Sequence, residues 1–356
     1  MTVVHVLEPF SSGVTTAVIN ITKQLPAIRH VVVHGCRMWV DAMENVKAKF
    51  PEGVSFIKWS RAGREINLIR DAQALWELIR LLKPYKAPET VIHLHSSKAG
   101  FLGRAACKAL GISAVLYTPH CGAFIRTDVP PLRRKFFRLL ERVGGWFGGT
   151  VVGCGESEAA LYRQLGKPVL WVPNGVEITS AGKDPAPSLI SFAGIAGIQK
   201  NPALFNRIAL FFQDEALPFY WIGGGPLQGA LTAQNITLTG WVDKAEVDAY
   251  LYKTLIYLST SSWEGLPFGV LEAMNASCAL LLSDVPGNRD LVIPGKNGYL
   301  FHDEDEAAGL IKKMLDHRQE TLDMGRKSRE LAESRYSAEK MGREYGKIYA
   351  AVGRGK

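Results

Sequence analysis

Short apolar runs alternate with longer, helix-patterned segments along this chain. The predicted elements of the first half follow one another at residues 3–7, 14–25, 30–34, 68–82, 91–95, 100–110 and 114–118. The short runs have the length of strands, and the longer segments repeat their apolar residues at helical spacing. Strands that alternate with helices are typical of βαβ units, so we predict a parallel sheet covered by helices.

The same alternation starts again in the second half of the chain. Its predicted elements lie at residues 189–192, 202–212, 219–222, 236–239, 247–252 and 256–259. Residues 180–187 between the halves are polar and broken by two prolines, which predicts a linker. We therefore predict an α/β protein with two doubly wound parallel-sheet domains, whose ligands bind beyond the carboxyl ends of the strands.

Composition narrows the class of protein. With 356 residues and 47% hydrophobic residues, the chain is long enough for two buried cores. It has no apolar run of the roughly 18 residues that a membrane span needs, and residues 1–10 do not have the pattern of a signal peptide. The five cysteines, Cys36 included, form no Cys-x-x-Cys pair, which fits neither a disulfide framework nor a zinc site. We expect a cytoplasmic protein.

The net charge of +8 comes from the first half of the chain. Residues 126–142 combine six basic with two acidic residues, interleaved with leucine and phenylalanine. A basic amphipathic helix of this kind can lie on an anionic membrane surface, and Arg133, Arg134, Lys135 and Arg138 are candidates for that contact. A solvated basic face is the alternative. No recognition motif accompanies the charge, so nucleic acid is not expected as a partner.

Two glutamates stand out in the second half, in a Glu-x7-Glu arrangement. Glu264 follows the apolar run 256–260 in a loop with glycine and proline, and Glu272 lies in the next helical segment. Pro267 suits the first turn of that helix, whose free N–H groups attract an anion such as a diphosphate. Two carboxylates that bind hydroxyls, beside groups that bind phosphate, predict a nucleotide-sugar site.

These residues and others resemble the GT4 family of retaining glycosyltransferases. The ordered landmarks are Ser12-Gly13, Tyr117-Thr118-Pro119-His120, Gly155-Glu156-Ser157, Pro173-Asn174-Gly175-Val176, Gln199-Lys200-Asn201-Pro202, the Glu-x7-Glu segment, residues 283–290 and residues 295–300. The resemblance covers nearly the whole chain. It implies the GT-B fold, in which two Rossmann-like domains face a central cleft. The implied boundaries are 1–180 for the acceptor side, 181–335 for the nucleotide-sugar side, and 336–356 for a helix that returns to the first domain.

The resemblance also implies roles for individual residues. His120, Glu264 and Lys200 would be catalytic, with Glu264 on the donor sugar, Glu272 on the ribose and Lys200 on the diphosphate. The implied donor-binding set is Gly13, Asn174, Gly194, Lys200, Glu264, Gly265, Leu266, Pro267, Phe268, Gly269 and Glu272. Gly240, Trp241 and Val242 would hold the nucleobase through main-chain groups. His95, Ser96 and Lys98 would line the acceptor side, and no metal or other cofactor is expected.

One departure from the family pattern removes a cation that would be expected to bind the diphosphate. Relatives carry arginine after the glycine that ends the first strand of the second domain, whereas Gly194 is followed here by Ile195. A charge-assisted contact is worth about 1.5 to 3 kcal/mol, so its loss calls for another cation. Arg289 and Lys98 are the candidates.

We therefore expect a glycosyltransferase that moves a hexose or N-acetylhexosamine with retention of configuration. The favoured donor is a UDP-sugar, although main-chain contacts leave the nucleobase open. Residues 95–104 and 117–124 resemble bacterial enzymes of surface polysaccharide synthesis, which implies a saccharide on polyprenyl diphosphate as acceptor and a peripheral position on the inner face of the plasma membrane. The alternatives are a nucleotide-sugar 2-epimerase, a transferase with a soluble acceptor, and a noncatalytic binding subunit.

Overall fold

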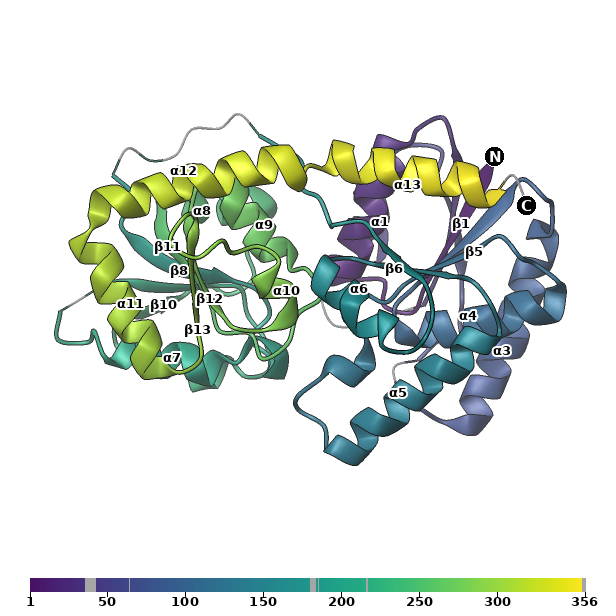
Figure 1. The fold of residues 1–356 in the computed structure, drawn as a ribbon, viewed down its shortest axis with the longest axis horizontal. Helices are drawn as coiled ribbons and strands as arrows, with labels where there is room; N and C mark the ends of the chain where they lie inside the picture. The colour runs from purple at the N-terminus through teal and green to yellow at the C-terminus, as the bar shows by residue number, and fades with distance from the viewer. Residues whose placement is uncertain (36–42, 64, 180–183, 185, 216, 354–356) are drawn as a thin grey trace. The chain divides into compact units, whose positions relative to one another are not determined.

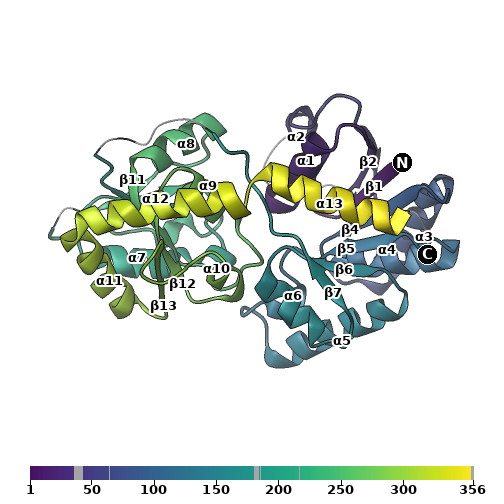
Figure 2. The ribbon, with the colours of Figure 1, turned by 45° about the horizontal axis from the view of Figure 1, so that its top comes forward.

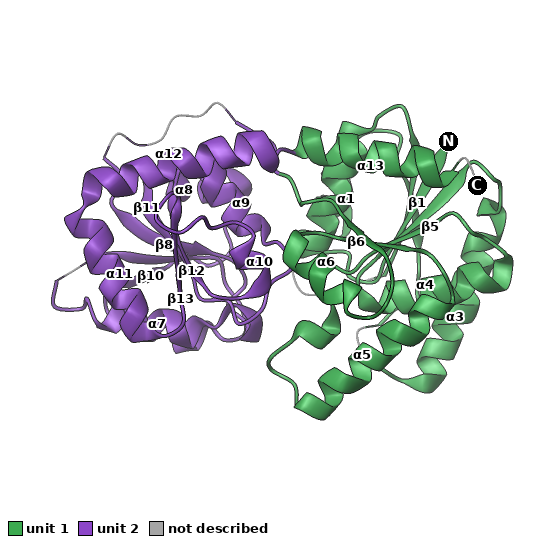
Figure 3. Cartoon of the chain, viewed as in Figure 1, with its two compact units in different colours: residues 1–175, 338–356 green, residues 176–337 purple. Residues whose placement is uncertain are grey.

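The computed structural model describes residues 1–353 except 36–42, 64, 180–183, 185 and 216. The chain forms two compact units, unit 1 from residues 1–175 and 338–356 and unit 2 from residues 176–337 (Figure 3). Most of the linker predicted at 180–187 lies outside the described residues, as does Cys36. Within the described parts of the chain, the helices all lack the length and hydrophobicity that a bilayer span demands.

Unit 1 is a parallel sheet with helices on both faces (Figure 1). Its strands are β1 (Thr2–Leu7), β2 (Arg29–His34), β3 (Ser55–Lys58), β4 (Thr90–His95), β5 (Val115–Thr118), β6 (Thr150–Gly153) and β7 (Val169–Trp171), in the spatial order β3-β2-β1-β4-β5-β6-β7. Its helices are α1 (Ser12–Gln24), α2 (Met43–Ala48), α3 (Leu68–Leu82), α4 (Ser97–Leu110), α5 (Pro131–Trp146), α6 (Glu156–Arg163) and α13 (Ala338–Gly353). Short 3₁₀ turns follow α3 and β5, at Lys83–Tyr85 and Ala123–Ile125.

The two faces of this sheet differ in character. The face toward α3, α4 and α5 is aliphatic and aromatic, with Val4, Val6 and Leu94 fully buried. On the other face, alternate positions of β1, β2 and β4 carry histidine among valines. Because successive side chains of a strand point to opposite faces, and because β1 pairs in register with both neighbours, these histidines gather on one face.

The last helix, α13, completes that histidine-bearing face. Figures 1 and 2 both show it running beside α1. Gly342 allows the close approach, because a Cβ there would lie 2.3 Å from the Cβ of Gln24. Tyr345 and Tyr349 of α13 are buried in the same cluster as Val3 and Val91. The C-terminal helix is therefore part of the core of unit 1.

A buried polar network joins α4, α5 and β5. The guanidinium of Arg104 donates to Glu141, 3.0 Å away, and stacks over the ring of Tyr117. The hydroxyl of Tyr117 donates to the other oxygen of Glu141 at 2.8 Å. Gly144 leaves room for this arrangement, since a Cβ there would lie 2.4 Å from the Arg104 guanidinium. These contacts fix the inner face of α5 and leave its outer face to solvent.

Unit 2 repeats the architecture on a second parallel sheet. Its strands are β8 (Leu189–Ala193), β9 (Phe219–Ile222), β10 (Ile236–Leu238), β11 (Thr254–Ser259), β12 (Ala279–Ser283) and β13 (Gly298–Phe301), in the order β10-β9-β8-β11-β12-β13. Its helices are α7 (Pro202–Leu210), α8 (Lys244–Lys253), α9 (Phe268–Asn275), α10 (Pro286–Arg289), α11 (Glu304–Asp316) and α12 (Arg318–Arg335). Two 3₁₀ turns lie at Ile198–Lys200 and Gln228–Ala230.

The predicted pair of doubly wound parallel sheets is confirmed. Element boundaries differ in places: α1 begins at Ser12 rather than at residue 14, so Gly13 lies in its first turn. The helix predicted from residue 247 begins at Lys244, because Asp243 caps it and exchanges hydrogen bonds with Glu246 in a capping box. A pattern of apolar residues does not detect the first turn of a helix where that turn consists mainly of polar residues.

Candidate functional site

The buried carboxylate of Glu264 is the centre of the candidate site in unit 2. It follows β11, its strand-end loop packs beside the loop after β8, and the residue is only 4% exposed. Lys200 forms an ion pair with one of its oxygens, and the amide of Gln199 donates to the other at 3.2 Å. A buried charge is stable when it is paired and hydrogen-bonded, and Glu264 has both kinds of partner.

The loop that carries Lys200 is fixed by backbone contacts. Asn201 has a positive φ of 50°, and its side chain caps α7 by accepting from the N–H of Leu204. The hydroxyl of Thr260 donates to the carbonyl of Lys200 at 2.8 Å, and the N–H of Ser262 donates to the carbonyl of Gln199. The loops after β8 and β11 are therefore joined, which fixes the position of the lysine relative to the carboxylate.

The start of α9 lies directly beyond Glu264. Pro267 is the N-cap, and the first intrahelical bond runs from the N–H of Leu271 to the carbonyl of Pro267. The three preceding N–H groups of the first turn have no partner within the helix, and such groups attract anions. Gly287 lets this loop pack closely, since a Cβ there would lie 2.2 Å from the carbonyl oxygen of Gly265.

The predicted second glutamate, Glu272, faces a cation that sequence analysis missed. Lys244, the first residue of α8, lies 3.4 Å from its carboxylate and also pairs with Asp248. Burial raises the pKa of Glu272, and the charge of Lys244 opposes that rise. The only sequence signal for Lys244 is its position two residues after the segment 240–242, since the contact depends on the packing of α8 beside α9.

Three glycine-containing turns meet at the ends of β8 and β9. A Cβ on Gly223 would lie 2.4 Å from the carbonyl oxygen of Gly194, so the close approach of these backbones requires glycine at position 223. Gly240 pairs with Gly223 in an isolated β-bridge, which brings the predicted nucleobase segment beside this contact. Trp241 is 57% exposed there.

The two cations considered as substitutes for the missing arginine are already engaged. Arg289 of α10 forms a two-pronged contact with Asp284. Lys98 of α4 is in unit 1, where it donates to Asp71 at 2.5 Å. Ile195 itself is half-buried. Among the described residues, Lys200 is thus the cation that this structure places against Glu264.

In unit 1, the ends of β1, β4 and β5 carry residues with a strained backbone. Ser12, Ser96, His120 and Cys121 all have positive φ, between 51° and 73°. For residues other than glycine this conformation is rare and tends to occur at functional positions. The hydroxyls of Ser96 and of Thr15 in α1 are buried without a hydrogen-bond partner among the described residues. Such orphaned groups fit a site that a polar ligand completes.

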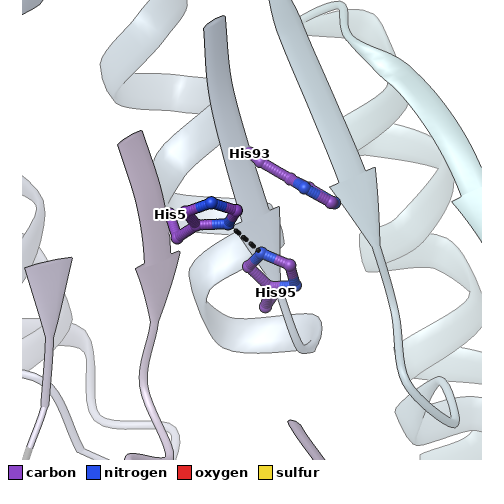
Figure 4. Close-up of side chains that lie close together, drawn as sticks. All are labelled: His5, His93 and His95. Carbon is purple, nitrogen blue, oxygen red and sulfur yellow. Dashed lines mark hydrogen bonds between the residues drawn. The ribbon is translucent and has the colours of Figure 1, made fainter. Parts of the chain in front are cut away.

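His120 lies at the end of a series of buried histidines. Its Nε2 is 3.0 Å from Nδ1 of His95, and Nε2 of His95 is 3.1 Å from Nδ1 of His5. His5 continues to His30 at 3.1 Å. Figure 4 shows His5, His93 and His95 together on the strands, with the contact between His5 and His95 drawn as a dashed line. The predicted acceptor-side residue His95 is therefore fully buried behind His120.

His5, His93 and His95 form the one group within the described residues that could gather around a metal ion. Their ring nitrogens already have other partners, however. His93 contacts the hydroxyls of Tyr349 at 2.7 Å and Thr118 at 2.9 Å, and His5 and His95 contact each other. These residues fit a hydrogen-bonded series, and a metal would have to break it.

Glu158 of α6 fixes the loop that carries His120, and sequence analysis did not single it out. The residue is 1% exposed. It accepts hydrogen bonds from the N–H groups of Cys121 at 2.6 Å, Gly122 at 3.3 Å and Cys154 at 2.8 Å. Burial raises the pKa of Glu158, and the three N–H donors oppose that rise. The predicted landmark at residues 155–157 lies next to it in the chain.

Asn174 lies at the end of unit 1, where the chain passes into unit 2. It is buried, and its N–H donates to the carbonyl of Cys154 at 3.1 Å. The side chain of Asn20 in α1 donates to the carbonyl of Gly175 at 2.7 Å. The connection between the units is therefore anchored to α1 and to the β6 end of unit 1.

The predicted basic amphipathic helix is α5, and its outer face is apolar as well as basic. Leu132, Phe136, Leu139 and Trp146 are 79%, 45%, 54% and 73% exposed. Their spacing places them along one stripe of the helix. The predicted basic residues Arg133, Lys135 and Arg138 are exposed on the same helix, and Arg134 is half-buried. Phe137 instead points inward and is buried.

Comparison with protein-family models assigns most of the chain. Residues 12–175 match the glycosyl transferase 4-like domain, and residues 227–331 match glycosyl transferases group 1. The first match coincides with most of unit 1. The second begins after β9 and ends within α12, so it contains both glutamates of the Glu-x7-Glu segment.

Two curated relatives act on lipid-linked substrates, by their names. The chain is 26% identical to the UDP-Gal:alpha-D-GlcNAc-diphosphoundecaprenol alpha-1,3-galactosyltransferase of Escherichia coli, over 71% of this chain and 73% of that protein. It is 21% identical to the GDP-mannose:cellobiosyl-diphosphopolyprenol alpha-mannosyltransferase of Komagataeibacter xylinus, over 74% of this chain and 71% of that protein.

Solved structures share the fold along nearly the whole chain. Sucrose-phosphate synthase from Thermosynechococcus elongatus superposes with a TM-score of 0.80 at 16% identity, over 99% of both chains. HepE of Anabaena in complex with UDP-glucose gives a TM-score of 0.78 at 14% identity, over 99% of this chain and 100% of that chain.

Proposed function

Because the chain belongs to the GT4 glycosyltransferases and has the GT-B fold, we propose that it transfers a hexose or N-acetylhexosamine from a UDP-sugar to a saccharide on a polyprenyl diphosphate. The observation that carries the donor side is the buried Glu264, held by Lys200 and Gln199 beside the first turn of α9. The Escherichia coli relative and the HepE complex support the uridine nucleotide, whereas the Komagataeibacter xylinus relative is named for GDP-mannose. Both curated relatives support the lipid-linked acceptor.

Each part of the donor meets a group of matching chemistry in this proposal. The carboxylate of Glu264 accepts hydrogen bonds from sugar hydroxyls, and Glu272 accepts them from the ribose. The first-turn N–H groups of α9 and the ammonium of Lys200 hold the diphosphate, whose negative charge grows as the sugar leaves. Lys200 remains close to Glu264, so a single cation serves both the sugar carboxylate and the phosphates.

Transfer with retention of configuration then depends on placement and electrostatics rather than on a side-chain base. His120 fits a binding role, because burial lowers its pKa to about 3 and leaves it neutral. A neutral imidazole of such low basicity orients a hydroxyl but takes up no proton at neutral pH. We expect the reaction to need no metal ion, since Lys200 and the α9 N–H groups supply the positive charge.

The acceptor side of the proposal rests on α5. Apolar side chains that enter a lipid interface and flanking basic residues that attract anionic headgroups are the two features of interfacial helices. The outer face of α5 has both. We propose that α5 holds the enzyme peripherally on the inner face of the membrane, where its lipid-linked acceptor resides.

The test is incubation of the protein with UDP-, GDP- and ADP-sugars, with and without a polyprenyl diphosphate-linked saccharide in vesicles. We expect nucleotide release from a UDP-sugar only when the acceptor is present, and a product that keeps the anomeric configuration. Release without acceptor, together with an epimerised sugar, would identify a 2-epimerase instead. Transfer to a water-soluble saccharide with no affinity for anionic vesicles would identify a soluble-acceptor enzyme.

Ile195 favours a second candidate, a noncatalytic binding subunit. The two cations considered as replacements for the arginine, Arg289 and Lys98, both have carboxylate partners in the structure. In that case the protein would bind UDP weakly and leave every donor intact. Calorimetric titration with UDP and the transfer assay, each repeated with an Ile195→Arg variant, separate the two candidates. An enzyme shows turnover and gains donor affinity from the arginine. A noncatalytic subunit shows no turnover with or without the arginine.

A further inference from the structure

Four histidines of unit 1 are hydrogen-bonded in series across one face of the sheet. The series runs from His30 near the beginning of β2, through His5 in the middle of β1 and His95 at the end of β4, to His120 after β5. It therefore crosses the sheet diagonally, from near the amino end of its strands to the carboxyl end where ligands of such sheets bind.

A main-chain carbonyl beside His30 fixes the direction of the series, that is, which nitrogen donates in each of its hydrogen bonds. Nε2 of His30 lies 3.0 Å from the carbonyl oxygen of Leu25, which can only accept a hydrogen bond. Nε2 of His30 must therefore carry the proton. A neutral imidazole holds one N–H and one lone pair, so Nδ1 of His30 is an acceptor.

The same reasoning passes along the series. The acceptor on His30 requires His5 to donate from Nε2, which leaves a lone pair on Nδ1 of His5. His95 then donates from Nε2 to His5 and accepts at Nδ1. His120 must donate from Nε2 to His95, so its Nδ1 presents a lone pair. Nδ1 of His120 has no hydrogen-bond partner among the residues that the structure describes.

This assignment requires all four rings to be neutral, and burial provides that condition. Burial lowers the pKa of His30, and it lowers the pKa of His5 and His95 well below 6.5, with the neighbouring histidines lowering it further. It lowers the pKa of His120 to about 3. A proton added to Nδ1 of His30, His5 or His95 would set two N–H groups against each other, and one added to His120 would occupy the lone pair on its Nδ1.

We propose that His30, His5 and His95 are positioning residues that hold His120 in the tautomer whose Nδ1 accepts a hydrogen bond. If the protein is the transferase proposed above, His120 then recognises a group on the sugar that donates a proton. A hydroxyl meets this requirement. A carboxylate, such as that of a hexuronic acid, offers only lone pairs and is rejected at this position.

The tautomer of His120 can be read directly by nuclear magnetic resonance. Correlation of ring protons with ¹⁵N distinguishes a ring nitrogen that bears a proton from one that does not. In protein labelled at histidine, with His120 assigned by its loss in His120→Gln, we expect a proton on Nε2 and none on Nδ1. A proton on Nδ1 of His120 in the unmodified chain would overturn the proposal.

Variants at His30 test whether the direction of its hydrogen bonds determines the tautomer of His120. His30→Leu removes the contact to Leu25, so both directions become available and His120 should show a mixture of tautomers. His30→Gln keeps a donor for Leu25 and an acceptor for His5, and should restore the original spectrum. Unchanged His120 signals in folded His30→Leu would show that the tautomer is set locally, against the proposal.

His34 supplies the matched control. It lies on the same strand, is 1% exposed, and uses Nδ1 on the carbonyl of Gly35 rather than in the series. His34→Gln should leave the His120 spectrum unchanged. Zinc found at one equivalent per chain by elemental analysis would also overturn the proposal, since a metal between His5 and His95 would break their hydrogen bond.

A kinetic readout links the series to recognition of the sugar. In a series of donors with one hydroxyl at a time replaced by fluorine, which cannot donate, one position should lose about 2- to 10-fold in kcat/KM. That loss should persist in His30→Gln and shrink in His30→Leu. An equal loss in both variants would contradict transmission through His5 and His95. The spectra need no substrate, so a failure of the transferase assignment leaves the test of the series intact.

Discussion

At the scale of single residues, neighbouring side chains hold the carboxylate of Glu264 at both of its oxygens. Its two oxygens are divided between a cation and an amide, and both partners lie on a loop that is itself hydrogen-bonded to the loop after β11. Such an arrangement holds the carboxylate in one orientation before any ligand arrives. Preorganised polar groups of this kind stabilise charge without reorganisation during the reaction.

We predict that Glu264→Gln lowers kcat/KM by roughly 100-fold, as for loss of one preorganised electrostatic contact. The substitution keeps the shape but removes the charge that Lys200 and the sugar both use. The measurement is steady-state transfer from the preferred donor. Glu304→Gln is the matched control, because it removes an exposed ion pair with Arg207 in the same unit and should change the rate little. An equal effect of both substitutions would contradict the assignment.

Glu158 acts in unit 1 on the strained loop of His120. We predict that Glu158→Gln reduces the free energy of unfolding by about 1 to 3 kcal/mol, because an amide cannot accept three N–H bonds as a carboxylate does. The pKa of Glu158 is raised by burial, so the folded state binds its proton more tightly than the unfolded state does. As pH rises from the pKa of Glu158 in the unfolded chain through its higher pKa in the folded chain, the free energy of unfolding therefore decreases.

The pH dependence supplies the check on Glu158. Denaturation measured between pH 4.5 and neutrality should show a smaller loss of stability with rising pH in Glu158→Gln than in the unmodified chain. A steeper loss in the variant would contradict the assigned direction of the pKa shift. Glu156, which is exposed on the same helix, gives the control substitution.

At the scale of elements, the histidine-bearing face of the first sheet should make unit 1 sensitive to acid. The pKa values of His5, His93 and His95 lie well below 6.5 in the folded chain, because burial disfavours the charged ring. Below pH 6.5 the unfolded chain binds protons that the folded chain does not, so stability falls as pH falls. Each histidine contributes about 1.4 kcal/mol per pH unit in that range.

We predict that amide protection of β1 and β4, measured by hydrogen exchange and corrected for intrinsic rates, decreases from pH 7 to pH 5. The decrease should be smaller in His30→Gln, which removes one ring of lowered pKa. The pKa of His302 in unit 2 is shifted in the opposite direction, because Glu306 raises it. His302→Gln should therefore not reduce the acid sensitivity, and if it did so as strongly as His30→Gln, the explanation would be wrong.

The helix α5 carries the prediction for membrane binding. Phe136→Ser should weaken binding to vesicles with anionic lipids by about tenfold, because a large apolar side chain contributes about 1.5 to 3 kcal/mol when fully buried and Phe136 would be buried in part. Arg138→Gln should weaken it by a similar factor and reduce its dependence on salt. Vesicle sedimentation measures both.

Unit 2 offers a closely matched control for this helix. Phe211 is 46% exposed and Phe136 is 45% exposed, but Phe211 follows α7, which carries Arg207 as its one basic residue. Phe211→Ser should leave vesicle binding unchanged. If it weakens binding as much as Phe136→Ser does, the effect is general hydrophobicity and α5 is not the membrane-binding surface.

At the scale of the whole molecule, the sequence predicted two parallel sheets and located β1, β2, β4, β5, β8, β9, β10 and β11, but it did not locate β3, β6, β7, β12 and β13. Buried parallel strands are nearly continuous apolar runs, so β1, β2, β4 and β11 could be located from composition alone. The positions of Glu264 and Glu272 on a loop and a helix were also predictable from local pattern. By contrast, the contact of Lys244 with Glu272 and the histidine series arise from packing and strand register, which no local pattern records.

The family resemblance implied that the C-terminal helix returns to the first domain, but its individual contacts belong to this second class, since they join residues more than 220 positions apart in the chain. Tyr349 contacts His93, and Tyr345 contacts Thr118. Both tyrosines are fully buried against β1, β4 and β5, in the core cluster that contains Val3. A chain without α13 would expose this apolar cluster and the hydrogen-bonding partners of the tyrosines.

We predict that a chain ending at residue 337 folds unit 2 and fails to stabilise unit 1. Met341, Tyr345 and Tyr349 are each nearly fully buried, and burial of a large apolar side chain contributes about 1.5 to 3 kcal/mol. Hydrogen exchange followed by mass spectrometry should show lost protection in β1, β4 and β5 and unchanged protection in β8, β11 and β12. A chain ending at residue 353 is the control. Equal loss in both units would show that α13 stabilises the molecule in some way other than by completing the core of unit 1.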